Sequence, residues 1–311
     1  MMIKINYLDK KKGLNKNTAV FIYSNVNLSR FEGTIDSKIY PKISEYLKKN
    51  KNSKDNKIIS LNQDFDQNLI VIYLSKKNGE LESEKLGAKF YDFLKSKNIY
   101  DIHIKTPETK NYLDIESFIH GVELKSYEFN LYKTKKNKKE ININILKNKN
   151  QINKNIKYNL DAVLNGINFT RDLVSEPGNI LHPDEYAKRL IKLKKYGLKV
   201  TVYDQKKLKK LGCNALLGVG QGSIRGSYLV TIEWKGNKSK SKPLAFIGKG
   251  VCFDTGGYSL KPARFMEDMT YDKAGSAAVV GLMKTLALRK AKVNVVGAVG
   301  LVENMVSGNA Q

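Results

Sequence analysis

The most informative stretch of the sequence is Gly248-Lys249-Gly250-Val251-Cys252-Phe253-Asp254-Thr255-Gly256-Gly257-Tyr258-Ser259-Leu260-Lys261. It directly follows an apolar run at residues 243–247, which predicts a buried strand that opens into a glycine-rich turn. A second carboxylate, Asp272, comes at the end of the segment 269–272. In open α/β sheets, ligands bind at the edge where strands end in loops. The charged groups around this turn are therefore candidates for a functional site.

The residue types at the turn suit a site for divalent metal ions. Carboxylates such as Asp254 and Asp272 are hard oxygen ligands for zinc, manganese or magnesium, and Asp254 is the candidate for bridging two ions. Lys249 could become a ligand, because a nearby dication and a desolvated pocket both lower the pKa of an amine. Lys261 could remain charged and stabilise the oxyanion that forms when a carbonyl is attacked. Spacing alone does not exclude that all four are surface charges of a long loop.

Length and composition indicate a globular protein with two domains. The chain has 311 residues, 41% of them hydrophobic, which is enough for two cores. No apolar stretch approaches the ~20 residues of a membrane span, and residues 1–12 lack the pattern of a secretory signal. The two cysteines, Cys213 and Cys252, are too few for a disulfide framework and suit a reducing cytoplasm.

The net charge of +25 is typical of proteins that bind polyanions such as nucleic acid. The lysines, however, are dispersed among Asn and Ile, as at residues 48–52 and 147–150, and they are not interleaved with aromatic residues. Arginine, which reads bases and phosphates through paired hydrogen bonds, is scarce beside lysine. We therefore favour a solvated basic surface over a nucleic-acid site, and we expect no membrane partner.

The order of strand and helix patterns predicts an α/β fold in two parts. A small N-terminal α/β domain is expected over residues 1–132, with strands at 18–23, 68–74 and 99–105. The Lys- and Asn-rich segment 133–156 is expected to be a linker that contains one short strand candidate, 141–145. The second domain, residues 157–311, alternates helix and strand patterns, which predicts a mixed, largely parallel sheet covered by helices.

Two weaker signals predict ordinary structure. The run Gly218-Val219-Gly220-Gln221-Gly222 lacks the spacing of a phosphate-binding loop, so we expect a tight turn. The three histidines form no paired motif, and we expect each at a helix end or on the surface: His103, His120 and His182.

Several motifs, in order along the chain, resemble the leucyl aminopeptidase family, the dinuclear metallopeptidases of the cytosolic leucine aminopeptidase type. They are RDLVSEPGN at 171–179, GVGQGS at 218–223, GKGVCFDTGGYSLK at 248–261, MTYDKAGSAAVVG at 269–281 and ENMVSG at 303–308. The resemblance extends from about Asn159 to Ala310 and is weak in the first domain. It implies that residues 157–311 form a partial aminopeptidase catalytic domain.

By this resemblance, Lys249, Asp254 and Asp272 fall on metal-ligand positions, Asp254 on the bridging one, and Lys261 falls on the catalytic lysine. Met269 matches a position that lines the pocket for the substrate's first side chain. Members of the family release N-terminal, leucine-like residues from peptides when a metal-bridged water attacks the peptide carbonyl. The resemblance also implies a cytoplasmic homo-hexamer with two divalent ions, manganese, zinc or magnesium.

Two departures from the family pattern bear on activity. The family's signature Asn-Thr-Asp-Ala-Glu-Gly-Arg, which completes the metal sites, would follow residues 303–308, so we expect an incomplete chain. Without the ligands of this signature, we expect two metal ions to bind very weakly. We also expect the strand 293–301 to expose apolar surface. Lys273 stands where the family usually has an apolar residue, and a cation there would disfavour metal binding unless it points away. The alternatives are a non-catalytic basic protein that binds nucleic acid and a decayed family member.

Overall fold

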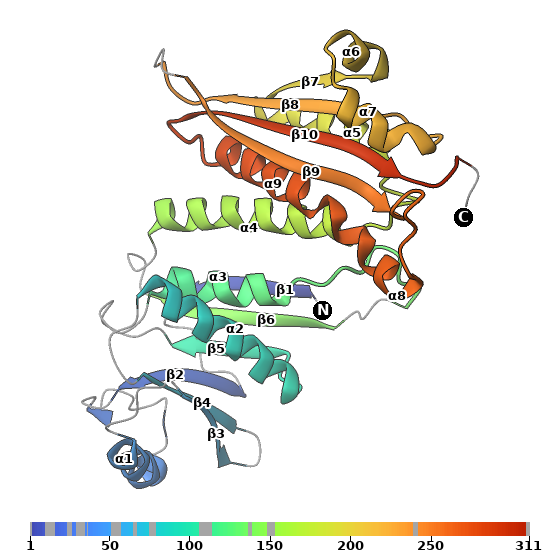
Figure 1. Cartoon of the computed structure of the whole chain (residues 1–311). Coiled ribbons are helices and arrows are strands. Elements are labelled where there is room, and N and C mark those ends of the chain that lie inside the picture. The colour runs from blue at the N-terminus through green and yellow to red at the C-terminus, as the bar shows by residue number, and fades with distance from the viewer. Residues whose placement is uncertain are drawn as a thin grey trace. The chain divides into compact units, whose positions relative to one another are not determined.

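The computed structural model of the chain shows two compact units, Met1–Leu160 and Asp161–Gln311, and each is described by itself. Helices and strands of both units are labelled in Figure 1. The structure describes the residues 2–9, 16–23, 27–28, 35, 37–50, 57–64, 67–74, 79–105, 114–135, 139–147, 153–238 and 242–308.

The first unit is built on a six-stranded sheet with the order β1-β6-β5-β2-β4-β3. Its pairings are parallel except for the antiparallel pair of β3 and β4. The strands are β1 Met2–Asp9, β2 Asn17–Tyr23, β3 Lys57–Asp64, β4 Gln67–Leu74, β5 Asp101–Lys105 and β6 Glu140–Lys147. Successive residues of β2 point to opposite faces, so Phe21 packs with helices α2 (Glu80–Ser96) and α3 (Ile115–Ser126), and Ile22 packs with α1 (Tyr40–Lys49). The sheet is therefore covered on both faces.

Strand β6 corrects the expectation of a linker over residues 133–156. Its residues 140–147 lie inside the first sheet, where β6 pairs with β1 on one side and with β5 on the other. Its isoleucines Ile141, Ile143 and Ile145 are buried. The strand candidate 141–145 is confirmed as part of β6, in which polar residues alternate with the buried isoleucines, but the abundance of Lys and Asn around it led to the wrong expectation of a linker. The division between the two units falls after Leu160.

The second unit contains a four-stranded sheet with the order β7-β8-β10-β9. The strands are β7 Lys199–Tyr203, β8 Tyr228–Lys235, β9 Leu244–Asp254 and β10 Asn294–Asn304. The mixed sheet is confirmed, but the expectation of mostly parallel strands is wrong here, because β7 with β8 and β8 with β10 are antiparallel. Only β9 and β10, which helix α9 (Ala274–Leu288) connects, form a parallel pair among the described strands of this second sheet.

Helices cover one face of this sheet more fully than the other. Helix α9, α5 (Pro183–Ile191) and the end of α4 (Lys154–Ser175) share one core with the sheet. Gly297 of β10 lies against Met283 of α9, whereas Gly300 lies against Leu216 of α7 (Asn214–Val219) on the other face. The remaining helices are α6 (Gln205–Lys210) and α8 (Ala263–Met266), with 3-10 turns that include η4 (Gly220–Gly222) and η5 (Glu267–Lys273). No helix in the described ranges is long and apolar enough to span a bilayer.

Exposed apolar surface lies on β9 rather than on β10. Strand β10 is interior to the sheet, and its residues Val295, Val299 and Leu301 are buried, which corrects the expectation for 293–301. Strand β9 lies at the edge of the described sheet, so Leu244 is 59% and Ile247 85% exposed. The run 243–247 is thus the start of a strand, as predicted, but not a buried one.

Candidate metal centre

The glycine-rich turn after β9 has a backbone that only glycine adopts readily. Gly256 and Gly257 have φ angles of 91° and 65°, in the left-handed region. Across the turn, Lys261 N donates to Thr255 O at 2.9 Å, and Thr255 N donates to Asn304 O of β10 at 2.9 Å. These bonds bring Lys261 back beside the end of β9.

Lys261 and Asp254 form one of two acid–amine pairs at this sheet edge. The Lys261 ammonium donates to Asp254 Oδ2 and lies 3.2 Å from the sulfur of Met269. Asp254 Oδ1 accepts hydrogen bonds from Gly256 N at 2.9 Å and from Asn304 Nδ2 at 2.8 Å. Three of the residues predicted for the site, Asp254, Lys261 and Met269, therefore meet.

Asp272 and Lys249 form the second pair. Turn η5 packs against β9 and brings Asp272 Oδ1 to 2.6 Å from the Lys249 ammonium. The Lys249 side chain is 60% exposed, whereas that of Asp272 is 16% exposed. Asp272 Oδ2 is buried and has no hydrogen-bond partner among the described residues. The two pairs share β9 and η5, so all five predicted residues belong to one edge of the sheet.

The surroundings of Asp254 favour its ionised form. Burial by itself would raise the pKa of this carboxyl, but the hydrogen bonds from Lys261, Gly256 and Asn304 outweigh burial and hold the pKa below its usual value. Asp254 is therefore a carboxylate at neutral pH, as a metal ligand must be.

These residues fit a divalent cation in part. The unpartnered oxygen of Asp272 is a buried acceptor that a cation would satisfy, and Asp254 adds a second hard oxygen ligand. The described residues hold no cluster of three or more His, Cys, Asp or Glu side chains placed for a metal. With Lys249 as an amine ligand the set numbers three, which is an incomplete shell for one ion and insufficient for two.

Lys273 does not crowd the two carboxylates. Its side chain is 0% exposed, and its Nζ donates to the carbonyls of Glu176 and Thr270, each at 2.7 Å. Burial lowers the pKa of this amine. These contacts direct the Lys273 ammonium away from the candidate metal ligands, which was the condition for metal binding beside this lysine.

A cavity of about 740 Å³ lies beside the site. The sequence motifs did not predict this cavity. Phe253 and Thr270, neighbours of the candidate ligands, form part of its wall with Arg225 and Glu303. Ser223 Oγ donates to Glu303 Oε2 at 2.8 Å. The motif GVGQGS contributes Ser223, and RDLVSEPGN and ENMVSG supply most of the other lining residues, which are Pro177, Gly178, Asn179, Ile224, Met305, Ser307 and Gly308. Three motifs distant in sequence thus converge on one space.

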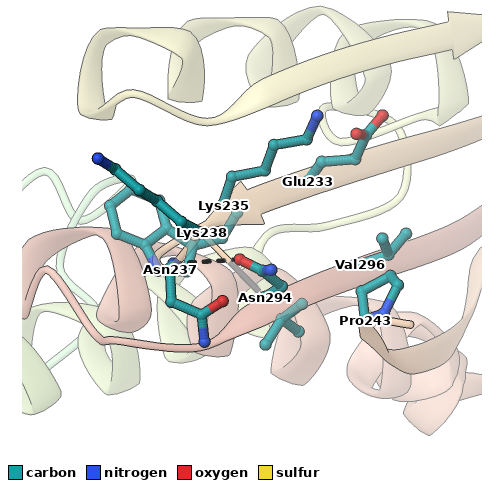
Figure 2. A pocket seen from close by; sticks show the side chains of 9 residues that line it. Glu233, Lys235, Asn237, Lys238, Pro243, Asn294 and Val296 are labelled. Atoms are coloured by element: carbon teal, nitrogen blue, oxygen red, sulfur yellow. Dashed lines mark hydrogen bonds between the residues drawn. The ribbon is translucent and has the colours of Figure 1, made fainter. Parts of the chain in front are cut away.

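A second cavity, of about 250 Å³, lies at the opposite end of the sheet, where β8 ends and β10 begins (Figure 2). Lys235 and Lys238 project beside it, and Asn237 N donates to Asn294 Oδ1 at 3.2 Å. None of the predicted site residues lines it.

The weaker sequence signals have mixed outcomes. His182 precedes α5 as its N-cap, as expected of a residue at a helix end. His103 and His120 are buried in β5 and α3, so the expectation of a surface or helix-end position is wrong for them. Gly218 and Val219 end helix α7 and Gly220–Gly222 forms a short 3-10 turn, so the expected tight turn is confirmed for residues 220–222 only.

Comparison with known proteins agrees with the motifs. Residues 168–311 match the model of the cytosol aminopeptidase family, catalytic domain. This part of the chain is similar to the catalytic domain of cytosol aminopeptidases. The resemblance stated from the motifs is confirmed, and the match does not favour a non-catalytic protein that binds nucleic acid.

Relatives in the cytosol aminopeptidase family are longer than this chain. A Brucella anthropi protein named Probable cytosol aminopeptidase is 52% identical over 198 residues, which cover 61% of this chain and 40% of the relative. A Rhizobium leguminosarum bv. trifolii protein of the same name is 44% identical over 238 residues, 71% of this chain and 48% of the relative. The chain therefore spans less than half the length of these relatives.

A solved structure shares the fold. The bottromycin maturation enzyme BotP, in complex with Mn, has a TM-score of 0.71 at 20% identity, with 95% of this chain and 61% of BotP covered. This likeness extends through the first unit, where the motifs resemble the family only weakly.

Proposed function

We propose that this chain carries part of the active site of a metal-dependent aminopeptidase that releases N-terminal, leucine-like residues from peptides. The observation that supports this most is the buried, unpartnered Oδ2 of Asp272 beside Lys249, at the same sheet edge as Asp254 and Lys261. A buried carboxylate oxygen without a partner is a binding point for a cation. In a domain similar to the catalytic domain of cytosol aminopeptidases, a cation bound there would act on the peptide substrate.

The proposed roles follow from the contacts. Lys249, Asp254 and Asp272 would hold the metal, which when bound supplies a Lewis acid for the peptide carbonyl. Lys261 is held by Asp254 and the sulfur of Met269, so its ammonium has a fixed position from which to stabilise the oxyanion of the substrate. Met269 would offer an apolar wall to the first side chain of the peptide.

Metal identity and assembly are further parts of the proposal. We propose two divalent ions in the natural protein, manganese or zinc, with magnesium as a third candidate. The described residues offer only an incomplete shell for one ion, so two ions would need further ligands beyond them. We also propose a cytoplasmic homo-hexamer, which the family resemblance implies.

The test is release of leucine from leucinamide by the natural protein that carries this sequence, supplied with Mn²⁺. Asp254→Asn and Asp272→Asn should abolish most of the release, because each removes a charged metal ligand. Asp268→Asn is the matched control, since Asp268 lies exposed on the same turn η5. A folded, metal-supplied protein that releases no leucine, or an Asp272→Asn variant as active as Asp268→Asn, would refute the proposal.

A further inference from the structure

Lys273 is the one residue of this neighbourhood that departs from expectation in both sequence and burial. It is among the largest fully buried side chains of the described chain, with 0% exposure. Lysine is almost never fully buried unless its ammonium finds partners. The burial of this amine next to a candidate metal ligand therefore needs a structural or functional explanation.

The partners of Lys273 are main-chain carbonyls on two different segments. One is Thr270 O, within turn η5 itself, and the other is Glu176 O, in the segment that follows helix α4, both at 2.7 Å. The Glu176 carboxylate is 3% exposed by residue and is fixed by Arg189 of α5 at 2.7 Å. The carbonyl that receives Lys273 thus belongs to a segment that is itself anchored.

The chain on the other side of Asp272 is fixed as well. The carbonyl of Lys273 accepts a hydrogen bond from Ser276 Oγ at 2.7 Å, and Ser276 Oγ lies 3.1 Å from Tyr186 OH of α5. The main chain before Asp272 is held through Thr270 and that after it through Lys273. The side chain between these ties reaches Lys249 and keeps one oxygen unpartnered.

We propose that Lys273 is a positioning residue for Asp272: by tying turn η5 to the Glu176 carbonyl, it holds the Asp272 carboxylate ready for a metal ion. This inference rests on the proposed function, because it assumes that Asp272 is a metal ligand. Second-layer contacts that orient a ligand contribute to affinity without touching the metal.

The test measures Mn²⁺ binding to the chain by electron paramagnetic resonance of free Mn²⁺, together with thermal unfolding. Lys273→Met keeps the length of the side chain and removes both donors, so we expect its Mn²⁺ dissociation constant to rise by about tenfold. Lys273→Gln retains an amide with two N–H donors and should recover part of the affinity. Lys284→Met is the matched control, because Lys284 is a partly buried lysine of α9, the helix that directly follows η5, and it donates to Asn165 O at 3.3 Å.

Each result decides between the explanations. Weaker Mn²⁺ binding by Lys273→Met than by Lys284→Met, at comparable unfolding temperatures and with recovery in Lys273→Gln, supports positioning. Equal Mn²⁺ affinity of Lys273→Met and the unaltered chain overturns the inference and leaves the proposed function intact. If neither Lys273 variant folds, the role is structural and the inference is wrong. If the unaltered chain binds no Mn²⁺, the metal site and the inference fail together.

Discussion

Each candidate carboxylate forms an ion pair with one lysine, and the two carboxylates differ in how many further hydrogen bonds they accept. Asp254 is held by Lys261 and two further donors, whereas Asp272 has Lys249 as its one side-chain partner among the described residues and keeps one oxygen without a hydrogen bond to them. Asp272 is therefore the carboxylate with spare capacity for a cation, and Asp254 is the one whose position is most strongly fixed.

Lys261 offers a test of catalysis that is separate from metal binding. Lys261→Gln removes the charge that would stabilise the oxyanion, so we expect kcat to fall by roughly 100- to 1000-fold with little change in KM. The measurement is steady-state hydrolysis of leucinamide by the natural protein with Mn²⁺. Tyr258→Phe is the control in the same loop, because Tyr258 is 96% exposed. A rise in KM at constant kcat would assign Lys261 to substrate binding instead.

Asp184 offers a test of stability against pH. Burial opposes its ionisation, but hydrogen bonds from Tyr228 OH at 2.7 Å and Gly226 N at 3.2 Å, with His182 nearby, hold its pKa below 3.8. A lowered pKa stabilises the folded chain fully above pH 3.8, and this stabilisation is lost as the pH falls through the folded pKa.

We therefore expect Asp184→Asn to lower the thermal midpoint near neutral pH, and the deficit to shrink as the pH drops below 3.8. Thermal unfolding across a pH series checks this, with Asp268→Asn as the exposed control. If the difference in thermal midpoint between Asp184→Asn and the unaltered chain stays constant down to the lowest pH, the charge of Asp184 does not contribute to the stability of the folded chain.

Most elements were predictable from sequence, but their directions and neighbours were not. The strand predicted at 18–23 from its continuous apolar run and the helix predicted at 274–288 from its small residues match the observed bounds closely. In contrast, β8 is a run of β-forming residues that reads the same in a parallel or an antiparallel pair, so its antiparallel partners could not be inferred. Likewise the burial of Lys273 depends on Glu176, which is distant in sequence.

The β9 edge leads to a prediction about self-association. An exposed, apolar edge strand offers unpaired backbone groups to a second strand. Ile247→Lys places a charge on this edge, so we expect less self-association at a nearly unchanged unfolding temperature, because Ile247 is 85% exposed. Light scattering coupled to size-exclusion chromatography measures this. Leu81→Lys, at a residue of α2 that is 55% exposed, is the control; equal effects of the two changes would rule out the edge as the cause.

At the scale of the whole molecule, chain length and the order of strand and helix patterns predict two domains, and the structure has two compact units. The Lys- and Asn-rich composition, however, wrongly predicted a linker over residues 133–156. Lys- and Asn-rich sequence is typical of linkers, yet residues 140–147 form a strand with neighbours on both sides. Local composition cannot show this, because the partners of β6 come from residues 2–9 and 101–105. The residues predicted for the metal site come from the short span 249–272, and the structure brings them to one edge of the sheet, but their roles as metal ligands stay a prediction.

The strand β6 predicts how the first unit behaves as a fragment. Residues 1–160 contain all six strands of its sheet, so we expect a cooperative thermal transition. Residues 1–132 lack β6, which leaves β1 and β5 without their common neighbour, so we expect a broad transition or none. Circular dichroism during heating of the two fragments checks this. A sharp transition in both would show that β6 is dispensable.

The same strand order constrains synthesis on the ribosome. Strand β1 leaves the exit tunnel before the other strands of the first unit, but its neighbour in the sheet, β6, is the last strand of the unit to be translated. The nascent segment 2–9, with its apolar residues Ile3, Ile5 and Tyr7, must therefore wait without its strand partner until residue 147 has emerged. This interval is when a chaperone that shields apolar segments would have the most effect on the yield of folded protein.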